Sequence, residues 1–280
     1  MGNGGSTLGL IFEGGSCMAY ETILYEKKGP IAYITLNRPR ILNAYNDTMG
    51  DELLDAHTDF EQDDDLHVLI LSGAGRAFCS GADVKQRQLR PLDEMKRIGG
   101  PAGGIRAAGG LMGLGQSVNW KPVISAVHGY VLGAGFGLAM ATDIIVAAEG
   151  TQFQIREVQR GIAGAQHWAT TWYWGGGRFA TEIALTGRYF SAEEAAQFGI
   201  VNRVVKADEI VAEAERVAEE IMTNPPLSVR ANVRVTRWFA RRMQEECTYY
   251  TGGLGLHMSE DFRESALAFV EKRPPAFKGR

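Results

Sequence analysis

The chain is organised around residues 121–157, KPVISAVHGYVLGAGFGLAMATDIIVAAEGTQFQIRE. The apolar run Val123–Val127 predicts a buried strand, and Gly133-Ala134-Gly135 follows it as a turn of small residues. Small residues let backbone N–H groups approach a ligand closely. We expect a helix over Phe136–Thr142, and the N–H groups and dipole at a helix start favour negative charge. Taken alone, Gly-x-Gly before a helix is more typical of tight packing than of a binding site.

A second stretch repeats this arrangement earlier in the chain. Leu66–Leu71 (LHVLIL) reads as a buried strand, and residues 72–83, SGAGRAFCSGAD, turn out of it toward another helix. Two units of this kind place small residues at two turns, so that two N–H donors point at one oxygen. Such a pair is the minimum of an oxyanion hole.

Five segments in the same order resemble the crotonase, or enoyl-CoA hydratase/isomerase, superfamily. The resemblance covers about residues 20–280 and implies an α/β fold, a spiral of repeated ββα units with a C-terminal helical trimerisation region. The matching segments are ITLNRPRILNAYN at 34–46, LILSGAGRAFCSGADVK at 69–85, KPVISAVHGYVLGAGFGLAMATDIIVAA at 121–148, LTGRYFSAEEAAQFGIVNRVV at 185–205 and FVEKRPPAFKGR at 269–280.

The resemblance also implies a site and its substrate. The backbone amides of Ala82 and Ala134 would hold the carbonyl oxygen of an acyl-CoA thioester, and Glu157 aligns with the glutamate that these enzymes use as acid and base. Phe277 and Lys278 resemble the segment that contacts the adenine and phosphates of coenzyme A. Coenzyme A enters as part of the substrate, with no metal or redox cofactor implied, and the assembly implied is a homotrimer or a dimer of trimers.

Two positions depart from the family pattern. Hydratases carry a second glutamate just inside the helix after the glycine-rich turn, where this chain has Gly137. Where the family has a Pro-Gly-Ala-Gly-Gly segment, residues 163–168 read AGAQHW, so His167 is a candidate second acid/base near neutral pH. The aromatic residues that follow either fill the acyl pocket or pack in the core; they are Trp168, Trp172, Tyr173 and Trp174.

Other polar residues have structural interpretations. We expect His128, at the end of a strand, to be structural, and Asp143 to satisfy buried backbone groups. The alternative for Glu157 is a surface carboxylate paired with Arg160, and Tyr249 and Tyr250 are weaker candidates for donors near the acyl group.

Composition narrows the function classes. The 280 residues carry 29 Lys and Arg against 33 Asp and Glu, a net charge of −4 without a basic block, which argues against a nucleic-acid or anionic-membrane surface. The 3 cysteines (Cys17, Cys79 and Cys247) show neither metal-ligand spacing nor an even number, so we expect reduced thiols in a cytoplasmic protein. The sequence contains no run of 18 apolar residues, so we expect no transmembrane helix.

The predicted organisation has three parts. Residues 1–19 are a flexible extension, residues 20–207 the ββα spiral that binds acyl-CoA, and residues 208–280 a helical region. Within the spiral, a hairpin precedes a helix capped by Asn46 or Asp47, and the glycine-rich residues 86–116 read as the variable wall of the acyl pocket.

The sequence leaves several reactions open. With Glu157 as the one matched carboxylate, the resemblance implies an enzyme that hydrates a 2-enoyl-CoA or shifts its double bond through an enolate. Gly137 weakens hydration, because two carboxylates hold a water from both sides. Thioester hydrolysis, C–C cleavage and decarboxylation in the same scaffold are alternatives, as is a non-catalytic CoA-binding protein.

Overall fold

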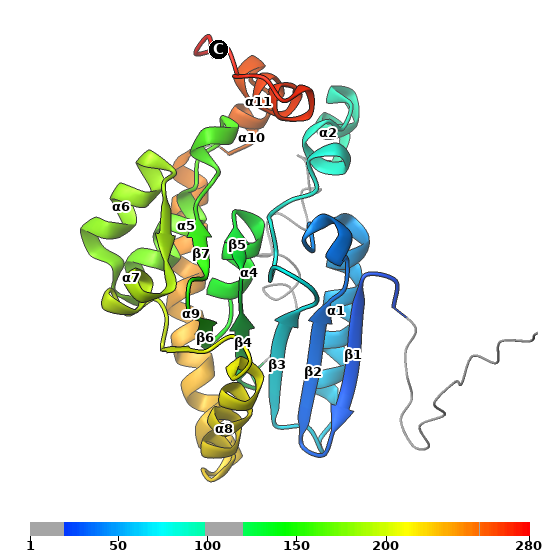
Figure 1. The fold of residues 1–280 in the computed structure, drawn as a ribbon, viewed down its shortest axis with the longest axis vertical. Coiled ribbons are helices and arrows are strands. Elements are labelled where there is room, and N and C mark those ends of the chain that lie inside the picture. The colour runs from blue at the N-terminus through cyan, green and yellow to red at the C-terminus, as the bar shows by residue number, and fades with distance from the viewer. Residues whose placement is uncertain (1–19, 99–119, 252) are drawn as a thin grey trace, which may run out of the picture.

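The computed structural model describes residues 20–98, 120–251 and 253–280. The predicted extension 1–19, with Cys17, and residues 99–116 of the predicted pocket wall lie outside this part of the chain. The described residues form two sheets with helices around them and a helical C-terminal part (Figure 1). This is the α/β fold that the resemblance implied.

The larger sheet has six strands in the order β1-β2-β3-β4-β6-β9. β1 and β2 form the predicted antiparallel hairpin, and all other neighbours in this sheet are parallel. Its strands are Ile23–Lys28, Ile31–Leu36, Val68–Gly73, Val123–Val127, Ile144–Ala148 and Arg203–Val205. The smaller sheet, β5-β7-β8, consists of Tyr130–Leu132, Gln152–Gln154 and Tyr189–Ser191.

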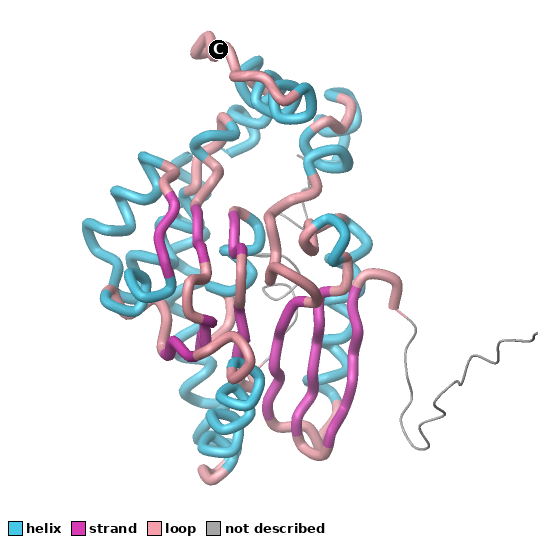
Figure 2. The backbone as a smooth tube through the Cα atoms, in the orientation of Figure 1, coloured by secondary structure: helices cyan, strands magenta, loops and turns pink. Residues whose placement is uncertain are grey.

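The first four strands lie in the larger sheet, and from β4 to β9 the chain passes back and forth between the two sheets. α4 follows β5, and α5 and α6 follow β7, so each pair of strands is completed by helix (Figure 2). The helices of this part are α1 Asp47–Gln62, α2 Leu92–Ile98, α4 Ala134–Met140, α5 Ala165–Thr171, α6 Gly177–Thr186 and α7 Ala192–Gln197.

Every element after β9 is helical, as the Ala/Glu/Arg-rich pattern predicted. These elements are α8 Ile210–Met222, α9 Pro226–Thr251, α10 Gly253–His257 and α11 Glu260–Glu271. Within the described residues, no helix is both long enough and apolar enough to cross a membrane.

The middle strands of the larger sheet are buried on both faces, because their side chains alternate between two cores. Leu69 and Leu71 of β3 belong to the main core with α1, whereas Val68 and Ile70 pack on the opposite face with α8. The predicted apolar face of α1 is fully buried: Met49, Leu53, Ala56 and Phe60. Full burial of a large apolar side chain stabilises the fold by about 2 kcal/mol.

Helix α1 begins as predicted. The side chain of Asn46 accepts a hydrogen bond from the N–H of Met49 at 2.9 Å, so Asn46 and not Asp47 is the N-cap. The predicted bounds of helix α4, Phe136–Thr142, are wrong by two residues, because the helix spans Ala134–Met140. The reason lies at Gly133, whose φ of 48° turns the chain directly into the helix.

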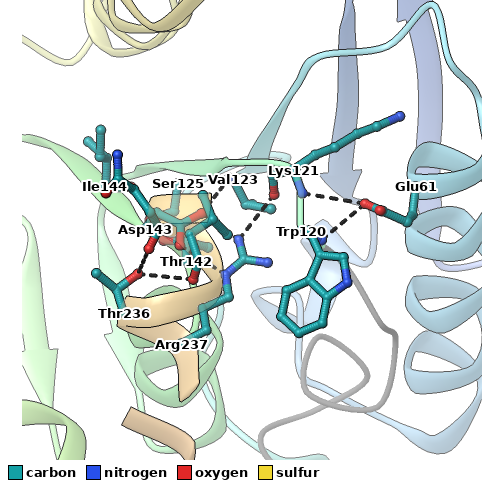
Figure 3. A network of polar contacts seen from close by, with 12 residues as sticks. Glu61, Trp120, Lys121, Val123, Ser125, Thr142, Asp143, Ile144, Thr236 and Arg237 are labelled. Atoms are coloured by element: carbon teal, nitrogen blue, oxygen red, sulfur yellow. Dashed lines mark hydrogen bonds and ion pairs between the residues drawn. The ribbon is translucent and has the colours of Figure 1, made fainter. Parts of the chain in front are cut away.

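Asp143 joins the start of β4 to α9, in keeping with its predicted structural role. Its carboxylate accepts from the N–H of Val123 at 2.8 Å and from the Nε of Arg237 at 2.9 Å. Figure 3 shows Arg237 reaching from α9 to this carboxylate and to the carbonyl of Lys121. The strand that leads into the glycine-rich turn is therefore anchored to a helix almost one hundred residues later.

The anchor predicts a stability effect. Arg237→Met leaves the Asp143 carboxylate without its cation, and we expect the free energy of unfolding to fall by about 2–3 kcal/mol. The side chains of Arg237 and Asp143 are 21% and 15% exposed, so solvent screens part of the loss. Arg241→Met is the control, since Arg241 pairs with Glu245 on the exposed face of the same helix. Equal effects of the two substitutions in urea unfolding would contradict the anchor.

Candidate active site

The two predicted turns lie against each other. The N–H of Cys79 donates to the carbonyl of Tyr130 at 3.0 Å, and the N–H of Leu132 donates to the carbonyl of Cys79 at 3.0 Å. A side chain at Gly135 would collide with Cys79, because a Cβ there would lie 2.4 Å from its carbonyl oxygen. The segment after β3 thus runs beside β5 and the start of α4.

The backbone N–H groups of Ala82 and Ala134 both lie outside regular backbone hydrogen bonding. The carbonyl of Gly81 and the N–H of Asp83 bond with Tyr45 on one side, so the N–H of Ala82 points to the other side. Ala134 is the first residue of α4, and the first N–H groups of a helix have no acceptor within it. Neither N–H donates to another described residue.

The two segments meet closely at Gly81. Its φ is +106°, and a Cβ there would lie 3.1 Å from the carbonyl oxygen of Leu132 and 3.9 Å from the nitrogen of Ala134. Only glycine permits this approach without moving the neighbouring backbone. The residue before Ala82 therefore packs on the residues around Ala134, which is the arrangement that a two-donor hole needs.

Glu157 lies at the same turn. Its Oε1 would be 3.2 Å from a Cβ built on Gly133, the residue before Ala134. Its Oε2 is buried and has no hydrogen-bond partner among the described residues. The side chain is 13% exposed. A buried carboxylate oxygen without a partner is costly, and such groups concentrate where a substrate completes the site.

The predicted pair of Glu157 with Arg160 does not form, because no ion pair joins them within 4 Å in the described residues. The side chain that approaches the Glu157 carboxylate is instead that of His167, whose Nε2 lies 3.7 Å from Oε1. The structure thus brings together Glu157, His167 and the Gly133–Ala134 turn.

His167 is held in one orientation. Its Nε2 lies 3.0 Å from the carbonyl oxygen of Gly133, and since a carbonyl only accepts, Nε2 carries the proton. The ring stacks on Phe136 with centroids 5.9 Å apart. His167 is therefore an N–H donor to the turn beside Glu157, and its role as an acid or base stays a prediction.

Gly137 places no group at the site. It is buried in α4, where its N–H donates to the carbonyl of Gly133 at 2.9 Å. The position of the second glutamate in hydratases is thus one turn along the helix from Gly133, and here it lacks a side chain.

Within the described residues, no hydrogen bond or ion pair joins the other candidates to Glu157. His128 bonds through Nε2 to the carbonyl of Gly75 at 2.9 Å, in keeping with a structural role. Tyr249 and Tyr250 are largely exposed on α9. Trp168 donates to Thr181 at 3.1 Å and stacks on the half-exposed Trp172, so this aromatic pair lies on the α6 side of α5.

Phe277 and Lys278 lie at the beginning of α11. The N–H of Lys278 donates to Asp261 at 2.6 Å, its Nζ lies 3.4 Å from Glu260, and Phe277 is half exposed. An exposed ring beside a lysine is chemically suited to a nucleotide, and their role in binding coenzyme A stays a prediction.

Cys79 has no role as a nucleophile. Burial raises the pKa of its thiol to about 12, so the thiolate is absent near neutral pH. Its contribution is to pack between the two turns.

The sequence interpretation missed the support of Ala82. Arg38 lies 3.1 Å from the carboxylate of Asp83 and also donates to the carbonyl of Ala44, so it ties the residue next to Ala82 to the loop that precedes α1. A signal was present, because Arg38 and Asp83 fall within two of the matching segments, but nothing local indicated that they pair.

A family model described as enoyl-CoA hydratase/isomerase matches residues 26–280. A probable enoyl-CoA hydratase of Mycobacterium bovis is 34% identical over 269 residues, which cover 94% of this chain and 100% of the relative. A mevalonyl-coenzyme A hydratase of Aspergillus fumigatus is 36% identical over 254 residues, 89% of this chain and 91% of the relative.

A solved structure is similar over nearly the whole chain. It is the crystal structure of a carnitinyl-CoA hydratase from Mycobacterium avium, with a TM-score of 0.79 and 31% identity, covering 94% of this chain and 100% of that one.

The site geometry makes Gly133 testable. Gly133→Ala introduces a Cβ at a φ of 48°, in contact with Oε1 of Glu157, and we expect a loss of turnover of about 100-fold because the carboxylate and the turn are displaced. Gly150→Ala is the matched control, since Gly150 also has a positive φ but a Cβ there meets nothing within 4 Å. Steady-state kinetics in which both variants keep wild-type activity would refute the placement of the site.

Proposed function

Because the chain belongs to the enoyl-CoA hydratase/isomerase, or crotonase, superfamily, we propose that it is an enzyme acting on an acyl-CoA thioester through a stabilised enolate. The N–H groups of Ala82 and Ala134 hold the thioester oxygen, and Glu157 carries the proton. One observation supports this assignment above the others: the Glu157 carboxylate lies against Gly133 with a buried oxygen that has no partner among the described residues.

The chemistry follows from charge. When Glu157 removes a proton from the carbon next to the thioester carbonyl, negative charge moves onto the carbonyl oxygen. Two N–H donors stabilise that charge, each by about 3–4 kcal/mol, and the carboxylate contributes about 10²- to 10⁴-fold. The substrate supplies coenzyme A, and the proposal needs no further cofactor.

Among the reactions of this group, we favour double-bond migration. Glu157 removes a proton from C2 of a 3-enoyl-CoA and, after exchange of the carboxyl proton with solvent, delivers a proton to C4, so that the double bond moves to C2 and no other molecule is consumed. One carboxylate is sufficient for this transfer. Gly137 supports it, because the helix offers no second carboxylate to hold a water.

Hydration of a 2-enoyl-CoA is the second candidate. The observation that favours it is the distance of 3.7 Å between His167 and Glu157, which would let the histidine replace the missing glutamate in orienting a water. The relatives named as hydratases point the same way. Hydration adds the water oxygen to C3 and a proton to C2.

We place the nucleotide end of coenzyme A at Phe277 and Lys278. The half-exposed ring provides a stacking surface for adenine, and the ammonium group provides a charge for a phosphate. Lys278 forms an exposed ion pair with Glu260, and a phosphate would have to displace this weak interaction to bind the ammonium group.

We propose that the chain assembles as a homotrimer or as a dimer of trimers. Along α9, one helix face exposes an apolar stripe at positions spaced by three and four: Val235, Trp238 and Phe239 are each about half exposed or more. An apolar stripe of this kind is typical of a surface that is covered by another chain.

Product analysis tests the reaction. We expect the wild type to convert a 3-enoyl-CoA to the 2-enoyl ester in heavy water with deuterium incorporation and no added water, detected by mass spectrometry and NMR. Glu157→Gln should lose at least about 100-fold in rate, because the amide accepts no proton. Glu149→Gln, at an exposed position after β6, is the control and should keep full activity.

Other outcomes separate the alternatives. Gain of one water on a 2-enoyl ester, lost in Glu157→Gln and in His167→Ala, would replace migration by hydration. If neither ester reacts while coenzyme A esters still bind, double-bond migration and hydration are both wrong, and another reaction of the same scaffold or a non-catalytic CoA-binding protein takes their place.

Light scattering tests the assembly. We expect a mass three or six times that of the 30.5 kDa chain. A double substitution of Trp238 and Phe239 by glutamate should reduce it to the monomer, since charges would replace the apolar stripe. Arg241→Gln, on the same helix, should leave the mass unchanged; a monomeric wild type would contradict the proposal.

A further inference from the structure

The turn that carries Glu157 is fastened to α11. Directly after Glu157, Val158–Arg160 form a single turn of 3₁₀ helix, and Gly161 follows with a φ of +72°. In Figure 1 the chain leaving β7 rises toward α11 at the top of the molecule. A Cβ on Gly161 would lie 2.9 Å from the backbone nitrogen of Phe262 in α11, so the turn and the helix touch through their backbones.

Two side chains exchange hydrogen bonds across this contact. Nη1 of Arg160 donates to the carbonyl of Ser265 at 3.3 Å, and the hydroxyl of Ser265 lies 3.0 Å from the carbonyl of Arg160. The same hydroxyl lies 2.9 Å from the carbonyl of Phe262, so its one proton is shared between two acceptors. Ser265 is 3% exposed, and the guanidinium of Arg160 lies 4.3 Å from the ring centroid of Phe269.

The contact is transmitted to Glu157 through the backbone. The N–H of Arg160 and the N–H of Ile162 both donate to the carbonyl of Glu157, at 2.9 and 3.0 Å. The peptide group of Glu157 is therefore held by the residues that α11 holds. On the other side, Gly164 packs closely on Ile155, because a Cβ there would lie 2.8 Å from Cγ2 of Ile155, and the Cβ of Glu157 is its next neighbour at 3.4 Å.

Burying the charged guanidinium of Arg160 costs free energy that packing alone would not require. Burial, and to a lesser extent the charge of Arg156, lower the pKa of its guanidinium to about 10, and the nearby charge of Glu157 opposes both effects. No carboxylate of the described residues lies within 4 Å of it, and an apolar side chain of similar length would fill the space without the cost of burying a charge.

We propose that Arg160 and Ser265 are positioning residues, which hold the backbone of the Glu157 turn against α11 and so aim the carboxylate at the substrate. This inference rests on the proposed function of Glu157. Neither side chain touches the Gly133–Ala134 turn in the described structure, so both act on the rate of proton transfer and not on the hold on the thioester.

Kinetics of four variants test the proposal. Arg160→Met removes the donors and the charge at similar length, and we expect kcat to fall about 10- to 100-fold with KM changed less than about threefold, since a misplacement near 1 Å costs up to about 100-fold. Arg160→Lys should restore part of kcat. Ser265→Ala should lower kcat less than Arg160→Met does, and Ser265→Thr, which keeps the hydroxyl, should restore it.

An isotope effect separates positioning from simple destabilisation. With a substrate deuterated at C2, we expect a larger kinetic isotope effect in Arg160→Met than in wild type, because proton transfer becomes rate-limiting. Arg263→Met is the matched control. Arg263 is an exposed arginine on α11, the helix of Ser265, and its substitution should change neither kcat nor the isotope effect.

The outcomes distinguish this inference from the proposed function. If Glu157→Gln abolishes turnover but Arg160→Met and Ser265→Ala keep wild-type kcat, the positioning role is wrong and the function stands. If both lower kcat only in proportion to a loss of folded protein, measured by circular dichroism, and the isotope effect is unchanged, the role is structural and the inference is wrong. If Glu157→Gln keeps full turnover, the proposed function itself fails.

Discussion

The site depends on the close approach of backbones at Gly133. With a φ of 48°, this residue turns β5 into α4 and leaves the N–H of Ala134 at the helix start, outside regular hydrogen bonding. The same turn receives the carboxylate of Glu157 on one side and the N–H of His167 on its carbonyl. A side chain at this position would occupy the space that the carboxylate needs. The carboxylate of Glu157 can approach the N–H of Ala134 because Gly133, which lies between them, has no side chain.

The surrounding fold keeps this approach rigid from several directions. The parallel sheet brings the carboxyl ends of β3 and β4 to one edge, so the segment with Ala82 runs beside the segment with Ala134. Arg38 and Asp83 fix the first segment to the loop that precedes α1, and Arg237 fixes the beginning of the second to α9. Oxyanion stabilisation depends on donors that do not reorganise during the reaction, and these ion pairs lie on the segments that carry the donors.

Local patterns predicted what local physics determines. The cap at Asn46 and the strand ending at Val127 could be predicted because a helix start and an apolar run are written within a few residues. The predicted start of α4 was two residues late, because the conformation of Gly133 is set by its neighbours in space. Arg237 and Ser265 were not predicted as partners of the site region, since they lie 94 and 105 residues from the groups they bind. The resemblance supplied the site residues, and it carried no information on how His167 is oriented.

The central claim is that two backbone N–H groups, from Ala82 and Ala134, receive the thioester oxygen beside Glu157. Infrared difference spectroscopy of a saturated acyl-CoA, with ¹³C at the thioester carbonyl, measures this interaction directly. The account predicts that the carbonyl stretch of the bound ester lies at a lower frequency than in water, because two aimed donors polarise the bond more than solvent does. A bound ester whose carbonyl stretch equals that of the free ester in water would contradict the account.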